Sequence, residues 1–286
     1  MDRSLQEFLR QAAAQLHGHS PSPRLDAQVL AMHVCALDRA QLITRADIPL
    51  SLEQEQTLQR LLAQRRTGIP MAYITGVREF WSMSLGVTPD TLIPRPDTET
   101  LVEHALALIP MQAPWRIADL GTGSGAIALA LAHERPHCHI IATDISTAAL
   151  AVARTNAKRH GLDNIEFRAG PWEVPLGREL FEMIVSNPPY VRLSDAHLSQ
   201  GDVRFEPSLA LIAGEDGLDA IRHIVQYSPP WLKAGGWLLL EHGFDQAEAV
   251  DRILRGNDYE KIDTFRDYAG LARITQASRP LSRTHD

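Results

Sequence analysis

Apolar residues recur at helical spacing in the first part of the chain. One face of a first predicted helix carries Leu5, Phe8, Leu9, Ala12 and Leu16. Prolines within residues 21–23 interrupt the pattern, and two further apolar stripes follow at residues 24–37 and 51–66. Ser51 is suited to cap the helix that starts after it. We therefore predict a small all-helical domain over residues 1–72.

The pattern changes character after residue 72. Residues 73–76 (Tyr-Ile-Thr-Gly) and 79–81 (Glu-Phe-Trp) are rich in β-branched and aromatic side chains, which favours a β-hairpin linker over residues 73–93. A Pro-Arg-Pro segment follows, and we expect Asp97 or Thr98 to cap a helix that ends at Leu108.

From residue 115 onward, short apolar runs alternate with amphipathic segments. We predict strands at residues 116–120, 139–143, 165–168, 181–186 and 236–241, and helices at 126–133, 147–160, 217–228 and 246–254. Two further runs, 259–265 and 271–275, are suited to an antiparallel pair that closes the sheet. The alternation predicts an α/β domain over residues 94–286, with a mostly parallel sheet covered by helices on both faces.

Composition narrows the class of protein. The 286 residues are 44% hydrophobic and 22% charged, as in a soluble globular protein. Two cysteines exclude a disulfide scaffold, and a net charge of −7 argues against a dedicated nucleic-acid binder. No apolar run approaches the roughly 18–20 residues that span a bilayer, and residues 1–4 do not begin a signal peptide. We expect a cytoplasmic protein with no membrane partner and no direct nucleic-acid partner.

A glycine-rich turn lies between the first strand of the α/β domain and its helix. It comprises Gly121, Thr122, Gly123, Ser124 and Gly125. Glycines let the backbone turn tightly and approach a ligand, and this first turn is the expected ligand site of an open α/β sheet. Asp144 ends the second strand, where a carboxylate can accept hydrogen bonds from both ribose hydroxyls. Together they indicate a cofactor that contains adenosine, with NAD and S-adenosylmethionine both open.

The fourth strand is followed directly by Asn187, Pro188, Pro189 and Tyr190. The two prolines stiffen the turn and remove two N–H donors. The Asn187 side-chain carbonyl and the Pro188 main-chain carbonyl can accept both hydrogens of a planar NH₂ group, while the Tyr190 ring packs on its plane. Such acceptors localise the nitrogen lone pair and direct it at a methyl sulfonium. The pattern therefore predicts methyl transfer to an amide or amino nitrogen.

One motif resembles a zinc site, but we interpret it as a polar loop between a helix and a strand. Residues 133–137 read His-Glu-Arg-Pro-His, but Pro136 would break the helix that must place both histidines on one face. We predict no metal. Trp172, after the third strand, is interpreted either as core or as part of an adenine pocket, and Arg95 either as a helix-start residue or as part of the mouth of the site.

These motifs resemble the HemK/PrmC family, the N5-glutamine methyltransferases of peptide chain release factors. The resemblance rests on residues 119–125 and 187–190, and it is narrowed by residues 73–76, 79–81, 92–99, 205–207 and 239–243. It implies a small all-helical N-terminal domain joined by a hairpin to a seven-stranded, Rossmann-like class I methyltransferase domain. The implied substrate is the glutamine of the Gly-Gly-Gln loop in class-1 release factors, and the implied role of residues 1–72 is release-factor recognition.

The resemblance also implies residue roles. Gly121 to Gly125 would hold the methionine part of S-adenosylmethionine, Asp144 the ribose and Trp172 the adenine, while residues 187–190 would bind the glutamine amide. Pro171 departs from the polar or acidic residue that the family often has before this aromatic.

Three rival functions are weighed against this one. A DNA adenine-N6 methyltransferase shares the 187–190 motif, but it needs a basic surface, whereas residues 76–286 are acidic. An NAD-dependent dehydrogenase leaves that motif unexplained. A release-factor-binding module without turnover is disfavoured because Asn187 and Asp144 are both present.

Overall fold

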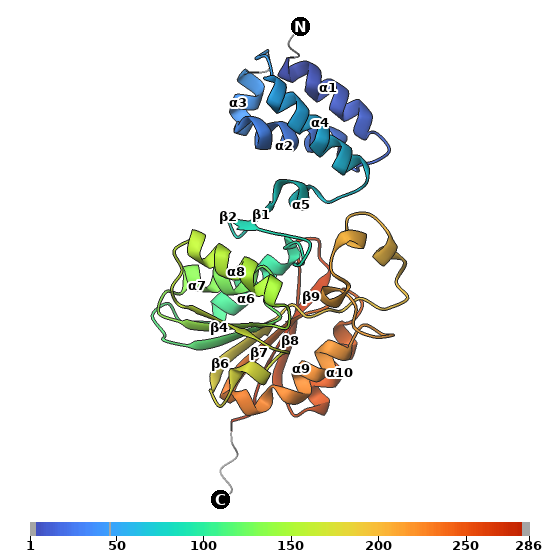
Figure 1. The fold of residues 1–286 in the computed structure, drawn as a ribbon. Coiled ribbons are helices and arrows are strands. Elements are labelled where there is room, and N and C mark those ends of the chain that lie inside the picture. The colour runs from blue at the N-terminus through green and yellow to red at the C-terminus, as the bar shows by residue number, and fades with distance from the viewer. Residues whose placement is uncertain (1–3, 46, 282–286) are drawn as a thin grey trace, which may run out of the picture. The chain divides into compact units, whose positions relative to one another are not determined.

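The computed structural model describes residues 4–45 and 47–281, which fall into two compact units (Figure 1). One unit comprises residues 1–77 together with 197–205, and the other comprises residues 78–196 and 206–286. The polar start of the chain, used above to expect a cytoplasmic location, lies outside the described residues up to residue 3. No described helix is both long enough and apolar enough to cross a bilayer.

The first unit is built from helices, as predicted. They are α1 (Leu5–Leu16), α2 (Pro23–Cys35), α3 (Arg39–Thr44), α4 (Leu52–Arg66) and α5 (Met71–Thr75). Four of the five residues of the first predicted stripe are fully buried, and Leu9 packs at the edge of the same core. Ser51 caps α4, because its hydroxyl accepts from Gln54 N while the Gln54 side chain accepts from Ser51 N.

A buried arginine joins the distant segment 197–205 to this unit. Arg65 is 3% exposed, and its Nε donates to Asp26 Oδ2 at 2.6 Å. Its Nη1 donates to Asp202 Oδ1 at 2.9 Å, and Arg204 donates to the carbonyl of Thr67. Because a buried guanidinium must be paired, these contacts fix residues 197–205 onto α4 and the turn after it.

The predicted hairpin is present, but part of its predicted position is wrong. It is formed by β1 (Val77–Phe80) and β2 (Met83–Gly86), whereas residues 71–75 form helix α5. Met71 and Ile74 pack against the helical core, and Gly76 ends α5 with φ 74°. This packing overrides the strand preference of residues 73–75.

The second unit contains the predicted sheet. Its strands are β3 (Arg116–Leu120), β4 (His139–Asp144), β5 (Ile165–Ala169), β6 (Phe181–Ser186), β7 (Leu232–Glu241), β8 (Glu260–Arg266) and β9 (Ala272–Ser278). The order is β5-β4-β3-β6-β7-β9-β8, in which β3 to β7 are parallel and β9 runs antiparallel to β7 and β8. The α/β class and the closing antiparallel pair are confirmed.

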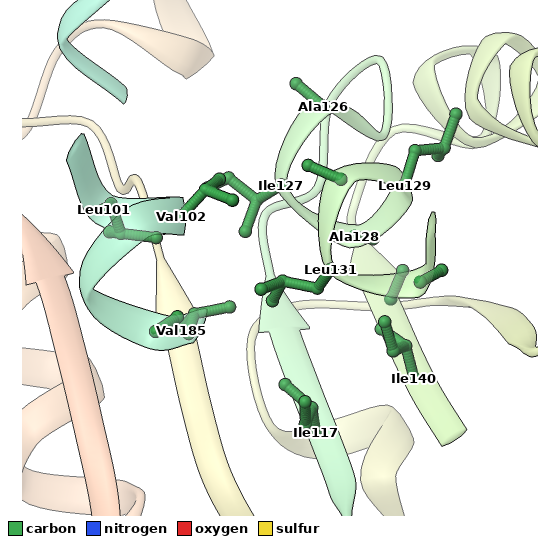
Figure 2. Close-up of a cluster of buried hydrophobic side chains, with 14 of the residues drawn as sticks. Leu101, Val102, Ile117, Ala126, Ile127, Ala128, Leu129, Leu131, Ile140 and Val185 are labelled. Carbon is green, nitrogen blue, oxygen red and sulfur yellow. The ribbon is translucent and has the colours of Figure 1, made fainter. Parts of the chain in front are cut away.

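Helices cover both faces of this sheet (Figure 1). One face carries α6 (Asp97–Leu108), α7 (Ala126–Glu134) and α8 (Thr147–Arg159), and the other carries α9 (Asp219–Tyr227) and α10 (Ala247–Gly256). Figure 2 shows Val102 of α6 beside Ile127 of α7 above the strands, and Leu101 and Leu131 belong to the same buried cluster. Every residue from 126 to 132 is buried, so α7 is a central helix packed on all sides.

The connections of the second unit include short 3₁₀ turns. These turns are Val174–Leu176, Ser208–Ala210 and Pro229–Trp231, while Ala196–Ser199 and Val203–Phe205 lie at or within the segment assigned to the first unit. The long connection between β6 and α9 therefore leaves the second unit at residue 197 and returns at residue 206.

Candidate active site

A cavity of about 320 Å³ lies at the carboxyl ends of the parallel strands. The strand order reverses between β3 and β6, and such a switch point is where open α/β sheets bind ligands. Eight of the predicted site residues line the cavity: Gly121, Thr122, Gly123, Ser124, Asp144, Trp172, Asn187 and Pro189. Gly125, Pro188 and Tyr190 were predicted with them but are not among its lining residues.

The glycine turn is held by the neighbouring strand. The main-chain nitrogens of Gly121 and Thr122 both donate to the carbonyl of Thr143 at 2.9 Å. Gly121, Gly123 and Gly125 have φ of 76°, 56° and 89°, which disfavours any residue with a Cβ. The turn therefore keeps its backbone against β4 and exposes Gly121 and Gly123 to the cavity.

Gly125 has a packing role. A Cβ on this residue would lie 2.5 Å from Leu129 Cδ1 and 3.2 Å from Ala153 Cβ. Its missing side chain lets α7 start directly after the turn and approach α8 closely. This explains why a residue of the predicted cofactor loop does not line the cavity.

Asp119 stabilises the glycine turn through a hydrogen bond to Thr122. It is fully buried, and its Oδ2 accepts from the Thr122 hydroxyl at 2.7 Å. Burial raises the pKa of Asp119 to about 7, and the Thr122 hydrogen bond acts against that rise. The buried carboxyl group thus fixes Thr122, and its desolvation favours the neutral form.

Asp144 lies at the rim of the turn. Its Oδ2 accepts from Gly123 N and its Oδ1 accepts from Ser146 N, each at 2.8 Å. Burial raises the pKa of Asp144, and these main-chain donors lower it. Each carboxylate oxygen has a second lone pair, so the group can still accept from two hydroxyls of a ligand.

Trp172 faces the glycine turn. Its Cζ3 lies 3.5 Å from the position that a Cβ on Gly121 would take. The Trp172 backbone has φ 46°, and its carbonyl accepts from the Thr143 hydroxyl at 2.8 Å. Pro171 lines the cavity beside it. Of the two interpretations of Trp172, the structure therefore favours the wall of the cavity.

Asn187 is held by a residue that the sequence interpretation assigned to another role. Its Nδ2 donates to Thr98 Oγ1 at 3.1 Å. Thr98 is the second residue of α6 and also lines the cavity, and Pro96 is the N-cap. The prediction that Asp97 or Thr98 caps the helix is wrong, because Asp97 Oδ2 instead lies 3.5 Å from Arg273 Nη2.

Tyr190 is half-buried and packs against the hydrophobic core outside the cavity lining. Its hydroxyl donates to Glu241 Oε1 at 3.1 Å, and burial raises the pKa of Tyr190. Glu241 ends β7 and is 1% exposed. This glutamate had no predicted role, although its place at the carboxyl end of a parallel strand is a signal that could have identified it.

Arg95 belongs to the cavity wall. Its Nη2 lies 2.5 Å from Glu206 Oε1, and Glu206 Oε2 accepts from Ile93 N at 3.2 Å. Glu206 is 6% exposed, and Arg95 lines the cavity. Of its two interpretations, the structure favours the mouth of the site over a plain helix-start residue.

The zinc-like motif does not assemble a metal site. Helix α7 ends at Glu134, so His133 and His137 do not share a helix. Across the part of the chain that is described, no three His, Cys, Asp or Glu side chains are grouped to hold a metal ion.

Comparison with known proteins gives matches over both units. Residues 7–76 match the family model of the PrmC N-terminal domain, and residues 97–203 match that of the methyltransferase small domain. The release factor glutamine methyltransferase of Escherichia coli (strain K12) is 50% identical over 94% of this chain and 97% of its own length. That of Vibrio cholerae (strain El Tor Inaba N16961) is 51% identical over 96% of both chains.

Solved structures show the same fold at lower identity. A methyltransferase from Pyrococcus furiosus has a TM-score of 0.54 at 14% identity, covering 80% of this chain and 99% of that one. The 16S rRNA N2 G1207 methyltransferase of Thermus thermophilus has a TM-score of 0.54 at 16% identity, covering 71% of this chain and 49% of that one.

Proposed function

Since the chain belongs to the release factor glutamine methyltransferase family, we propose that it methylates the side-chain amide nitrogen (N5) of a glutamine. The substrate is the glutamine of the Gly-Gly-Gln loop in class-1 peptide chain release factors, and the methyl donor is S-adenosylmethionine. The observation that carries this proposal is a single cavity lined by both the glycine turn and Asn187.

The residues around the turn fit S-adenosylmethionine. Gly121 and Gly123 bring bare backbone to the cavity, where the methionine part would lie. Asp144 accepts from the ribose hydroxyls with its free lone pairs, and Trp172 with Pro171 supplies an apolar surface for adenine. The cofactor brings a methyl group on a positively charged sulfur, and the acidic character of the protein complements that charge.

Residues 187–190 bind and activate the glutamine amide in this proposal. Asn187 Oδ1 and the Pro188 carbonyl accept the two N–H hydrogens of the substrate. An amide nitrogen is a weak nucleophile because its lone pair is delocalised into the carbonyl. Two acceptors that draw the hydrogens out of the amide plane localise that lone pair, and the cavity wall aims it. No strong base is needed, because the alkylated nitrogen is acidic and loses its proton readily.

The alternative of DNA adenine-N6 methylation is not favoured. The relatives at about 50% identity, which match almost the whole chain, are release factor enzymes. The chain also carries a net charge of −7, which opposes binding to a phosphate backbone.

Mass spectrometry tests the proposed function. The full chain is incubated with a class-1 release factor and S-adenosylmethionine, and the release factor is digested and sequenced. We expect a mass gain of one methyl group on the Gly-Gly-Gln glutamine. A release factor with alanine in place of that glutamine is the matched control and should gain none. Methyl groups on another residue, or on adenine in added DNA but not on the release factor, would refute the assignment.

A further inference from the structure

The contact between Asn187 and Thr98 determines which end of the Asn187 amide is committed to the protein. Nδ2 donates to Thr98 Oγ1 at 3.1 Å, while Asn187 lines the cavity. An amide has a donor end and an acceptor end that point away from each other. With the nitrogen engaged by Thr98, Oδ1 is the end that remains for a ligand.

Thr98 is itself fixed in place. It lies in the first turn of α6 and is 3% exposed, so packing restricts the rotation of its side chain. Its oxygen accepts from Asn187 Nδ2, and both residues line the cavity.

We propose that Thr98 is a positioning residue that holds Asn187 in the orientation needed for methyl transfer, an inference that rests on the proposed function. The Thr98 oxygen accepts from Nδ2, which commits the NH₂ end of Asn187 to the protein. Asn187 consequently offers Oδ1 to the substrate. The reversed amide would set its NH₂ against the substrate NH₂, and two donors cannot bond.

Thr98 variants test this positioning role. Thr98→Val keeps the shape of the side chain and removes the hydroxyl, whereas Thr98→Ser keeps the hydroxyl. Thr100→Val is the matched control, because Thr100 lies on the same helix, is 4% exposed, and has a buried hydroxyl without a partner. We expect Thr98→Val to lower the single-turnover rate about 10²-fold, as a misplaced catalytic group does, with unchanged affinity for S-adenosylmethionine. Thr98→Ser and Thr100→Val should retain most of the rate.

A double variant separates positioning from other roles. In an Asn187→Ala background, Thr98→Val should cause little further loss, because Thr98 acts through Asn187. A Thr98→Val protein with the wild-type rate, or a further 10²-fold loss in the double variant, would overturn the inference. These outcomes leave the proposed function intact, since that function fails only if the wild-type chain does not methylate the release factor.

Discussion

The two ends of the Asn187 side-chain amide have different roles. Its NH₂ group is tied to Thr98, and its carbonyl is left for the proposed substrate. The motif at residues 187–190 was sufficient to predict the acceptor role, because the chemistry depends on residue type. The partner Thr98 could not be predicted, because it lies 89 positions away and meets Asn187 only in the folded protein.

Replacing Asn187 should abolish most turnover without unfolding the protein. Asn187→Ala removes a preorganised acceptor, and such losses typically lower kcat about 10²–10³-fold. The residue follows the end of β6 and is only half-buried, so the core should be unaffected. Single-turnover methylation measures the loss, and circular dichroism checks the fold. A folded variant that turns over like the wild type would remove Asn187 from the mechanism.

Asp144 should govern cofactor affinity. Asp144→Asn keeps one acceptor but loses the charge and turns a donor toward Gly123 N or Ser146 N, both of which it now accepts from. We expect S-adenosylmethionine to bind more weakly by about 1.5–3 kcal/mol, the range for hydrogen bonds to a charged group. Calorimetry measures the affinity. NAD, titrated into the wild type in parallel, should show no binding, and tight NAD binding would contradict the cofactor assignment.

At the scale of elements, prediction succeeded where local pattern and packing agreed. Ser51 was predicted as the cap of α4 and forms a capping box, and the run 181–186 was predicted as β6 with identical bounds. Prediction failed where tertiary contacts override local preference. Residues 73–75 favour a strand but form the end of α5, because Met71 and Ile74 pack against the helical core.

The glycine turn makes a prediction about stability and pH. The pKa of Asp119 is about 7 in the folded protein against a usual 3.8. Between these values the folded state holds a proton that the unfolded state releases, so this contribution to stability falls as the pH rises through 7. Asp119→Asn is permanently neutral. We therefore expect its stability relative to the wild type to increase from pH 5 to pH 8, by at most about 1.4 kcal/mol per pH unit.

Urea unfolding at a series of pH values measures this difference. Asp163→Asn, at an exposed position in the same unit, is the matched control for the loss of one carboxyl group. A constant difference between Asp119→Asn and the wild type across this range would show that Asp119 is ionised in the folded protein.

At the scale of the molecule, the helical unit has a proposed role in recognising the release factor away from its reactive loop. Deleting residues 1–72 is a poor test of that role. The deletion would remove Arg65 and Thr67, which bind Asp202 and Arg204 of the segment 197–205. The segment 197–205 is joined at both ends to the second unit, at residue 196 and at Glu206. Freeing the segment from the helical unit could therefore lower activity by itself, whatever the helical unit does in recognition.

Surface variants test recognition of the release factor and leave the contacts of Arg65 and Thr67 with the segment 197–205 in place. Ile43 and Leu52 are each 72% exposed on the helical unit, and Met111, 64% exposed on the other unit, is the control. We expect the wild type to have a KM at least about tenfold lower for a whole release factor than for a Gly-Gly-Gln peptide, a difference of about 1.4 kcal/mol. Ile43→Glu combined with Leu52→Glu should raise the KM for the whole factor about tenfold and leave the KM for the peptide unchanged, while Met111→Glu should change neither.

Equal KM values of the wild type for the two substrates would mean that the helical unit contributes nothing to recognition. A double variant that raises the KM for the peptide as well would mean that the substitutions act on the cavity and not on a separate docking surface.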